Sequence, residues 1–351
     1  MTKKQENRTI ILDNGEEAKA TFPVVISASR STDIPAFYAD WFFNRLKKGY
    51  SAWTNPFNGK KSYVSYEDTQ FIVFWSKNPR PLLNHLDYLK ERGIGCYIQY
   101  TLNDYEEEKL EQGVPMLEKR IETFKLLVDK LGKGAVVWRF DPLILTDKID
   151  KDKLLRKIEN IGDQLKGYTE KLVFSFADII SYRKVKINLE RNHINYIDWT
   201  KDKMTEIAHE LVNLNKTNEW NYTLATCGEA YDFEGIKHNS CIDDRLMVRF
   251  GYNSKKLMNF LGAEFIDEYD MYGMPEDAIL LDNNKYAIIN NNNKDKGQRK
   301  ACGCMKSKDI GEYNTCPHLC EYCYANTSKE IAIANWERHQ LNKNNDTITG
   351  C

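Results

Sequence analysis

The sequence predicts an α/β protein, a partial (β/α)6 TIM-like barrel with parallel strands that ends in a C-terminal cysteine loop. Six short apolar runs alternate with segments of helical periodicity, an order typical of parallel α/β folds. The runs are largely apolar without strict alternation, which indicates strands that are buried on both faces. Polar residues follow every run, and in a barrel the carboxyl ends of the strands meet at one mouth.

The elements follow one another in a regular order. Residues 1–20 predict a polar extension with a small hairpin, and residues 21–230 the barrel core. The expected strands are 24–28, 71–75, 96–100, 135–140, 172–176 and 222–226, and the expected helices are about 38–46, one ending near 92, 114–131, 151–165 and 201–215. Residues 231–300 predict an irregular insertion, with a helix at 241–250 and an exposed loop at 290–300. Residues 301–351 form the cysteine segment, packed on the barrel mouth, with a helix at 330–340 and a frayed tail.

Composition and charge exclude several classes of protein. The 351 residues are 42% hydrophobic and 29% charged, as in ordinary globular proteins. The formal net charge of -1 gives no electrostatic argument for nucleic acid or for an anionic membrane. The N-terminus lacks the apolar core of a signal peptide, and no run has the length of a membrane span. We therefore expect a cytoplasmic protein, whose nine cysteines are metal ligands or reactive thiols and not disulfides.

Polar residues at the expected strand ends are the candidates for binding and catalysis. For each residue alone, a helix cap or a turn is an equally good explanation, but such residues recur after all six strands. We assign catalysis to three of them and cofactor binding to five. The catalytic candidates are Arg30, Arg139 and Asp141, and the cofactor-binding candidates are Lys77, Thr101, Asn103, Ser175 and Glu229.

Five of the nine cysteines lie between Cys302 and Cys323. Cys316, Cys320 and Cys323 have the spacing C-x3-C-x2-C. Three thiolates so close together can reach three corners of a cuboidal iron–sulfur cluster, whereas a fully cysteine-bound cluster uses four. The fourth iron would then be open to a small molecule that carries an amine and a carboxylate. A structural zinc site, completed by other cysteines or by His318, is the alternative.

Four further cysteines predict a possible second metal site. Cys302 and Cys304 form a C-x-C pair, Cys227 ends the sixth strand, and Cys241 follows 14 residues later. Four thiols suffice for a fully bound iron–sulfur cluster or for zinc. The alternative is that Cys227 and Cys241 are small buried hydrophobic residues.

Two motifs carry a family resemblance. Residues 27–35 read SASRSTDIP, residues 302–304 read CGC, and residues 309–326 read DIGEYNTCPHLCEYCYAN. Over nearly the whole chain they resemble an uncharacterised bacterial family, a "domain of unknown function" with a C-terminal cysteine cluster. The three-cysteine spacing, with Tyr322 before the last cysteine, is similar to that of radical S-adenosylmethionine (SAM) enzymes. In those enzymes the cysteine loop follows the first strand, whereas here it follows the sixth, and Ser76-Lys77-Asn78 replaces their Gly-Gly-Glu.

The resemblance implies a [4Fe–4S] cluster on Cys316, Cys320 and Cys323 that reductively cleaves SAM, either to a 5′-deoxyadenosyl radical or for aminocarboxypropyl transfer. It also implies a small-molecule substrate and an electron donor such as flavodoxin or ferredoxin. From the residues, Arg30 and Arg139 are expected to bind an anionic group. Two other functions stay open. One is a barrel with structural zinc and a non-redox role, and the other is a lyase that repairs or modifies nucleic acid, which the net charge does not favour.

Overall fold

The computed structural model describes residues 7–55, 58–266, 275, 277–281 and 285–350. Its centre is an eight-stranded sheet in the order β13-β12-β10-β8-β7-β6-β3-β17, in which every neighbouring pair is parallel. The six inner strands follow chain order, as in a (β/α)6 barrel, which confirms the predicted partial TIM-like fold. The strands are β3 Val25–Ala28, β6 Phe71–Ser76, β7 Gly95–Thr101, β8 Val136–Leu143, β10 Lys171–Phe176, β12 Thr223–Thr226, β13 Lys237–His238 and β17 Lys308–Asp309.

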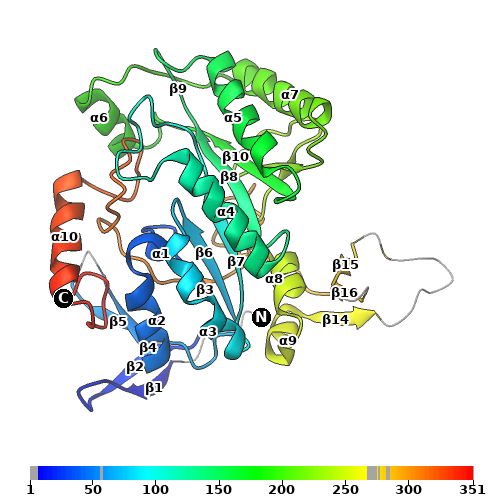
Figure 1. Ribbon diagram of the computed structural model, residues 1–351. Helices are drawn as coiled ribbons and strands as arrows, with labels where there is room; N and C mark the ends of the chain where they lie inside the picture. The colour runs from blue at the N-terminus through cyan, green and yellow to red at the C-terminus, as the bar shows by residue number, and fades with distance from the viewer. Residues whose placement is uncertain (1–6, 56–57, 267–274, 276, 282–284, 351) are drawn as a thin grey trace.

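Helices alternate with these strands (Figure 1). Local capping fixes where several begin: Asp150 accepts a hydrogen bond from the Lys153 N–H, and Thr200 accepts one from the Lys203 N–H. The helix at 183–191 was not expected from the sequence. The helices are α1 Ile34–Phe37, α2 Ala39–Lys48, the 3-10 helix η1 Arg80–Asn84, α3 Leu86–Glu91, α4 Leu117–Leu131, α5 Lys151–Leu165, α6 Arg183–Arg191, α7 Lys201–Thr217, α8 Asp244–Gly251, α9 Lys255–Leu261 and α10 Lys329–Leu341.

The two faces of the sheet pack into two apolar cores. Alternate strand residues such as Ile72 and Phe74 face one core, which includes side chains of α2, α4, α5 and α7. Their neighbours Phe71 and Val73 face the second core, together with α8 and α9. In Figure 1 both helices are yellow; α8 lies beside β7, and α9 packs against α8. Both faces are therefore covered, which explains why the strands are apolar without alternation.

Three smaller sheets surround the barrel. A four-stranded sheet has the order β1-β2-β5-β4, and its first hairpin matches the one expected near the N-terminus. Residues 231–300, expected to be irregular, contain a three-stranded sheet besides α8 and α9, with the order β14-β16-β15. The strands are β1 Arg8–Ile11, β2 Glu17–Thr21, β4 Tyr50–Thr54, β5 Lys61–Ser65, β9 Leu145–Thr146, β11 Tyr196–Ile197, β14 Ala263–Ile266, β15 Ile279–Leu280 and β16 Tyr286–Ile289, with β9 and β11 paired.

The C-terminal tail after α10 is not frayed, so that expectation was wrong. Thr347 and Ile348 are fully buried. The Ala52 N–H donates to the Asp346 carbonyl at 2.7 Å, and the Trp41 indole N–H donates to the Asn345 carbonyl at 2.9 Å. The tail thus packs against β4 and α2. None of the helices in the described part of the chain combines the length and the apolar character needed to cross a membrane.

Candidate metal and cofactor site

Residues 308–326 are docked on the first strand of the barrel. β17 pairs in parallel with β3, and the Asp309 carboxylate accepts hydrogen bonds from the Ser27 hydroxyl, the Ser29 hydroxyl and the Arg30 N–H at 2.8–3.0 Å. A Cβ atom at Gly311 would lie 1.8 Å from Ser29 Oγ, so only glycine permits this approach. The SASRSTDIP motif therefore contacts the motif around Asp309, although they lie at opposite ends of the sequence.

Asp33 is the second anchor of the cysteine loop. Its Oδ1 accepts from the Ala36 N–H and the Ser76 hydroxyl, and its Oδ2 accepts from the Lys77 N–H at 2.7 Å. His318 Nε2 also contacts Oδ2 at 2.7 Å, while His318 Nδ1 contacts the Gly113 carbonyl at 3.0 Å. Burial raises the pKa of Asp33, but the hydrogen bond and charge of His318 outweigh it and lower that pKa. With both ring nitrogens facing oxygen acceptors, His318 is not positioned to bind zinc.

The three cysteines lie on this anchored loop and are free thiols. Cys320 is buried, while Cys316 and Cys323 are half-buried. Asn326 closes the loop, because its side-chain N–H donates to the Cys316 carbonyl at 2.8 Å and its backbone N–H donates to Cys323 Sγ at 3.4 Å. The Tyr38 hydroxyl donates to the Thr315 carbonyl at 2.5 Å. Burial raises the pKa of all three thiols, and the charge of Lys77 opposes this effect at Cys320.

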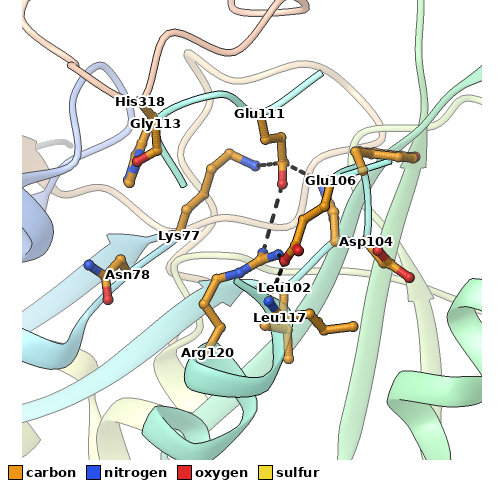
Figure 2. A network of polar contacts seen from close by, with 12 residues as sticks. Lys77, Asn78, Leu102, Asp104, Glu106, Glu111, Gly113, Leu117, Arg120 and His318 are labelled. Carbon is orange, nitrogen blue, oxygen red and sulfur yellow. Dashed lines mark hydrogen bonds and ion pairs between the residues drawn. The ribbon is translucent and has the colours of Figure 1, made fainter. Parts of the chain in front are cut away.

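A buried network of charges lies next to Cys320. Lys77 Nζ contacts Glu111 Oε1 at 2.7 Å and the Tyr322 hydroxyl at 2.8 Å, and the same hydroxyl donates to Glu111. Asn103 Nδ2 donates to Glu111 Oε1 at 3.1 Å and to the Tyr322 hydroxyl at 3.0 Å. Figure 2 shows Arg120 approaching Glu111 from the other side, with 3.8 Å between Nη1 and Oε2. Glu111 and Arg120 are each 1% exposed in their side chains.

Glu111 and Lys77 in this network stay charged although they are buried or half-buried. Burial alone would raise the pKa of Glu111, but the charges of Lys77 and Arg120 lower it to about 2. Burial would lower the pKa of Lys77, but the charge of Glu111 outweighs this effect and raises it. Glu106 Oε1 also lies 3.5 Å from Arg120 Nη2, so the network beside the cysteine loop has two cations, Lys77 and Arg120, and two anions, and their charges balance.

The other four cysteines form a second group inside the barrel. Cys227 and Cys241 have their sulfur atoms 3.3 Å apart. The N–H groups of Cys241 and Ile242 donate to Cys304 Sγ at 3.2 and 3.3 Å. The thiol of Cys304 also lowers the pKa of Cys302 to about 6 through a hydrogen bond. The structure thus brings together all four cysteines that were expected to share a site.

Two arginines lie against this four-cysteine group. Arg139 Nη1 donates to Cys241 Sγ at 3.2 Å and to Gln99 Oε1 at 3.1 Å. Burial would lower the pKa of Arg30, but the charges of Cys304 and Cys241 raise it. The two guanidinium groups each lie 5.3 Å from the ring centroid of Trp75. Two positive charges beside four thiols suit an anionic metal–thiolate centre.

The ends of neighbouring strands link the two cysteine groups. Arg139 Nη2 also donates to the Asp141 carboxylate, which accepts from the Ser175 hydroxyl as well. The Asp141 N–H donates to Asn103 Oδ1 at 2.9 Å, and Asn103 belongs to the network beside Cys320. A continuous chain of hydrogen bonds therefore runs from Cys241 to Tyr322.

The other predicted residues lie at the edges of this arrangement. Glu229 accepts a hydrogen bond from the Phe176 N–H at 3.0 Å, and burial raises its pKa. Thr101 is half-buried at the end of β7 and belongs to neither network. The sequence interpretation missed Asp33, Glu111, Arg120 and Asp309 as site residues. Glu111 carries no local signal, because it lies in a loop far from any strand end.

The spacing of Cys316, Cys320 and Cys323 suits an iron–sulfur cluster, whereas Cys227 and Cys241, with 3.3 Å between their sulfur atoms, are spaced like two ligands of one ion. Within the described ranges, no group of three or more His, Cys, Asp or Glu side chains is arranged to hold a single metal ion. A zinc ion needs about four ligands that converge at ~2.0–2.3 Å on one point. In a cuboidal cluster each cysteine binds a different iron, so the thiolates need not converge.

Glu312, in the segment between the two cysteine groups, gives a testable pH dependence. Its side chain accepts from the Ile348 N–H at 3.3 Å, and burial raises its pKa from 4.5 to about 7. Between these values the folded protein binds more protons than the unfolded chain, so stability falls as the pH rises. At pH 8, Glu312→Gln should therefore unfold at a higher urea concentration than wild type, and its free energy of unfolding should be larger by at most about 3 kcal/mol. Near pH 4.5 the two proteins should unfold at the same urea concentration. Glu337→Gln on exposed α10 is the control, and equal urea midpoints at pH 8 would contradict the prediction.

A comparison with family models places this geometry in a family. The model of a domain of unknown function, DUF1848, matches residues 25–325, which include both cysteine groups. The chain therefore belongs to this family. Neither the search of curated proteins nor the search of solved structures found a match.

Proposed function

We propose that this member of the DUF1848 family is a radical SAM-type iron–sulfur enzyme that acts on a small molecule. The observation that carries the proposal is the loop with Cys316, Cys320 and Cys323, anchored on the first barrel strand beside the mouth. It supplies three free thiols and leaves no histidine to complete a zinc site. A cluster with one open iron would supply one electron for the reductive cleavage of a sulfur–carbon bond in bound SAM.

The residues around the loop can be assigned roles in this chemistry. Lys77 and Asn103, beside Cys320, would orient the polar groups of SAM. Thr101, Ser175 and Glu229, at neighbouring strand ends, would complete its binding. Arg30 would bind an anionic group of the substrate, since its half-buried guanidinium faces Trp75. Arg139 donates a hydrogen bond to Asp141, and this pair would stabilise the arrangement of the strand ends at the barrel mouth.

We further propose that Cys227, Cys241, Cys302 and Cys304 bind a second iron–sulfur cluster. A four-cysteine cluster carries net negative charge, and Arg30 and Arg139 are placed to offset it. The hydrogen-bond chain through Arg139, Asp141 and Asn103 would couple this centre to the first.

SAM cleavage tests the main proposal. Protein that is purified and reconstituted anaerobically should be brown and, with dithionite, should convert SAM to 5′-deoxyadenosine or to methylthioadenosine. The Cys316→Ala/Cys323→Ala variant should lose this conversion, while Cys96→Ala, in the apolar core, should keep it. Protein that contains zinc in place of iron, or an iron-loaded protein that leaves SAM intact, would overturn the proposal.

A further inference from the structure

The helix α6 is strongly basic, although the whole chain has a net charge of -1. It carries four cations, Arg183, Lys184, Lys186 and Arg191, and one anion, Glu190, which leaves a net charge of +3. The side chains of Arg183, Lys184 and Arg191 are exposed. Such local excess of one sign selects partners of the opposite sign and speeds their approach.

α6 borders the three-cysteine loop directly. Lys184 Nζ donates to Thr327 Oγ1 at 3.3 Å, and Asn192 Nδ2, just after the helix, donates to Glu321 Oε2 at 2.5 Å. In Figure 1, α6 and α10 lie on the same side of the barrel, and residues 316–328 run between them. Cys323 is half-buried, and burial raises the pKa of its thiol while the charge of Lys184 on α6 acts to lower it, whereas Cys320 is buried beside Lys77.

Apolar side chains are exposed beside these cations. Ile180, Tyr182 and Ile187 are 66%, 43% and 40% exposed, and Tyr324, in the cysteine loop, is 45% exposed. The rings of Tyr182 and Tyr324 lie 6.1 Å apart and join the helix to the loop. Exposed aromatic and aliphatic side chains within a charged rim are typical of surfaces that bind another protein.

We propose that α6, together with Ile180, Tyr182 and Tyr324, is the docking surface for an acidic one-electron carrier protein that reduces the three-cysteine centre. The inference rests on the proposed function, which requires a reductant. In the transfer the carrier, a flavin or iron–sulfur protein, is oxidised by one electron and the centre is reduced by one electron. The surface places the carrier beside Cys323 and leaves the barrel mouth free for substrate.

Two observations favour a protein partner over nucleic acid. The exposed isoleucines Ile180 and Ile187 are aliphatic and suit contact with protein, since, unlike Tyr182 and Tyr324, they offer no ring on which a base can stack. The four cations of α6 lie on one helix of nine residues, which is too short for a long phosphate track.

Charge reversal tests the surface. The variant Arg183→Glu/Arg191→Glu changes two exposed side chains on α6, and Lys203→Glu/Lys216→Glu changes two exposed side chains on α7 by the same total charge. The probe is an acidic flavodoxin. We expect the α6 variant to bind it at least ~10-fold more weakly at low salt, because charge pairs set association, while the α7 variant changes less than about 2-fold. Reduction by dithionite, which needs no docking, should be unchanged in both variants.

Three outcomes would overturn the inference. One is wild-type flavodoxin affinity in the α6 variant, and another is an equal loss in the α7 variant, which would indicate non-specific attraction. The third is binding of a single-stranded oligonucleotide in preference to flavodoxin, with that binding lost in the α6 variant. Flavodoxin affinity is measured on protein with and without iron. Absence of iron would therefore contradict only the proposed function. The measured flavodoxin affinities would still show whether α6 is the docking surface.

Discussion

Cys320→Ala and Cys304→Ala are each expected to lose about half of the iron and sulfide of the wild-type protein, because each variant would break one of two independent clusters. Cys320 lies in the loop beside Lys77, and Cys304 lies in the group beside Arg139. The two variants should differ in what remains. Cys304→Ala should keep the iron that SAM can approach, whereas Cys320→Ala should keep only the fully cysteine-bound cluster.

Electron paramagnetic resonance of the reduced variants, with and without SAM, measures this difference. The signal of Cys304→Ala should change when SAM is added, and the signal of Cys320→Ala should not. The control is Cys96→Ala, whose cysteine is buried in the apolar core and should leave the iron content intact. Retention of all iron in Cys304→Ala would contradict a second cluster, and zinc lost from that variant would assign the four-cysteine group to zinc.

Glu111→Gln is expected to destabilise the fold by ~3–5 kcal/mol, since it leaves Lys77 without its counter-charge and Arg120 with only the exposed Glu106. Lys77 and Arg120 both contact this carboxylate, and the side chains of Glu111 and Arg120 are 1% exposed. Glutamine has nearly the same shape and can still accept from Asn103, so the effect isolates the charge. Urea unfolding at pH 7, followed by circular dichroism on iron-free protein, measures it.

Two controls, an exposed ion pair and a double variant, show whether the loss of stability comes from the buried charge of Glu111. Glu122→Gln breaks the pair with Arg80, whose side chains are 58% and 48% exposed, and should change stability by less than about 1 kcal/mol. Lys77→Met/Glu111→Gln removes one cation with the anion and should lose less than the sum of the single variants. Additive losses in the double variant would show that the charges of Lys77 and Glu111 are not coupled.

The barrel could be predicted from the sequence because its signals are local. Phe71–Trp75 is apolar at every position and Leu172–Phe176 at every position except Ser175, and each run lies within the strand that the structure shows. The hairpin strand β5, Lys61–Ser65, was missed, because its apolar residues are few and its first residues are exposed. The helix α6 was missed as well, since its many charges hide the two buried positions Val185 and Leu189.

The candidate site could be predicted only in part, for the same reason. Cysteine spacing is visible along the chain, so both groups of thiols could be named. The partners that hold them are remote: Asp33 contacts His318 across 285 residues, and Glu111 contacts Tyr322 across 211. A single sequence shows that these acidic and aromatic residues are present, but it carries no signal for the contacts between them. Buried charges can be identified only after the fold brings them together.

The pairing of β17 with β3 also sets the order of events during synthesis. Asp33 and its strand leave the ribosome first, and His318 follows 285 residues later. At ~5–20 residues per second, roughly 15–60 s separate the two. The six inner strands of the barrel, which end at Thr226, are complete before any of the five cysteines of the 302–323 segment is made. If the proposed clusters form, their assembly must therefore follow synthesis of the inner strands, and the edge of β3 has to wait for β17 to arrive late from the C-terminal end of the sequence.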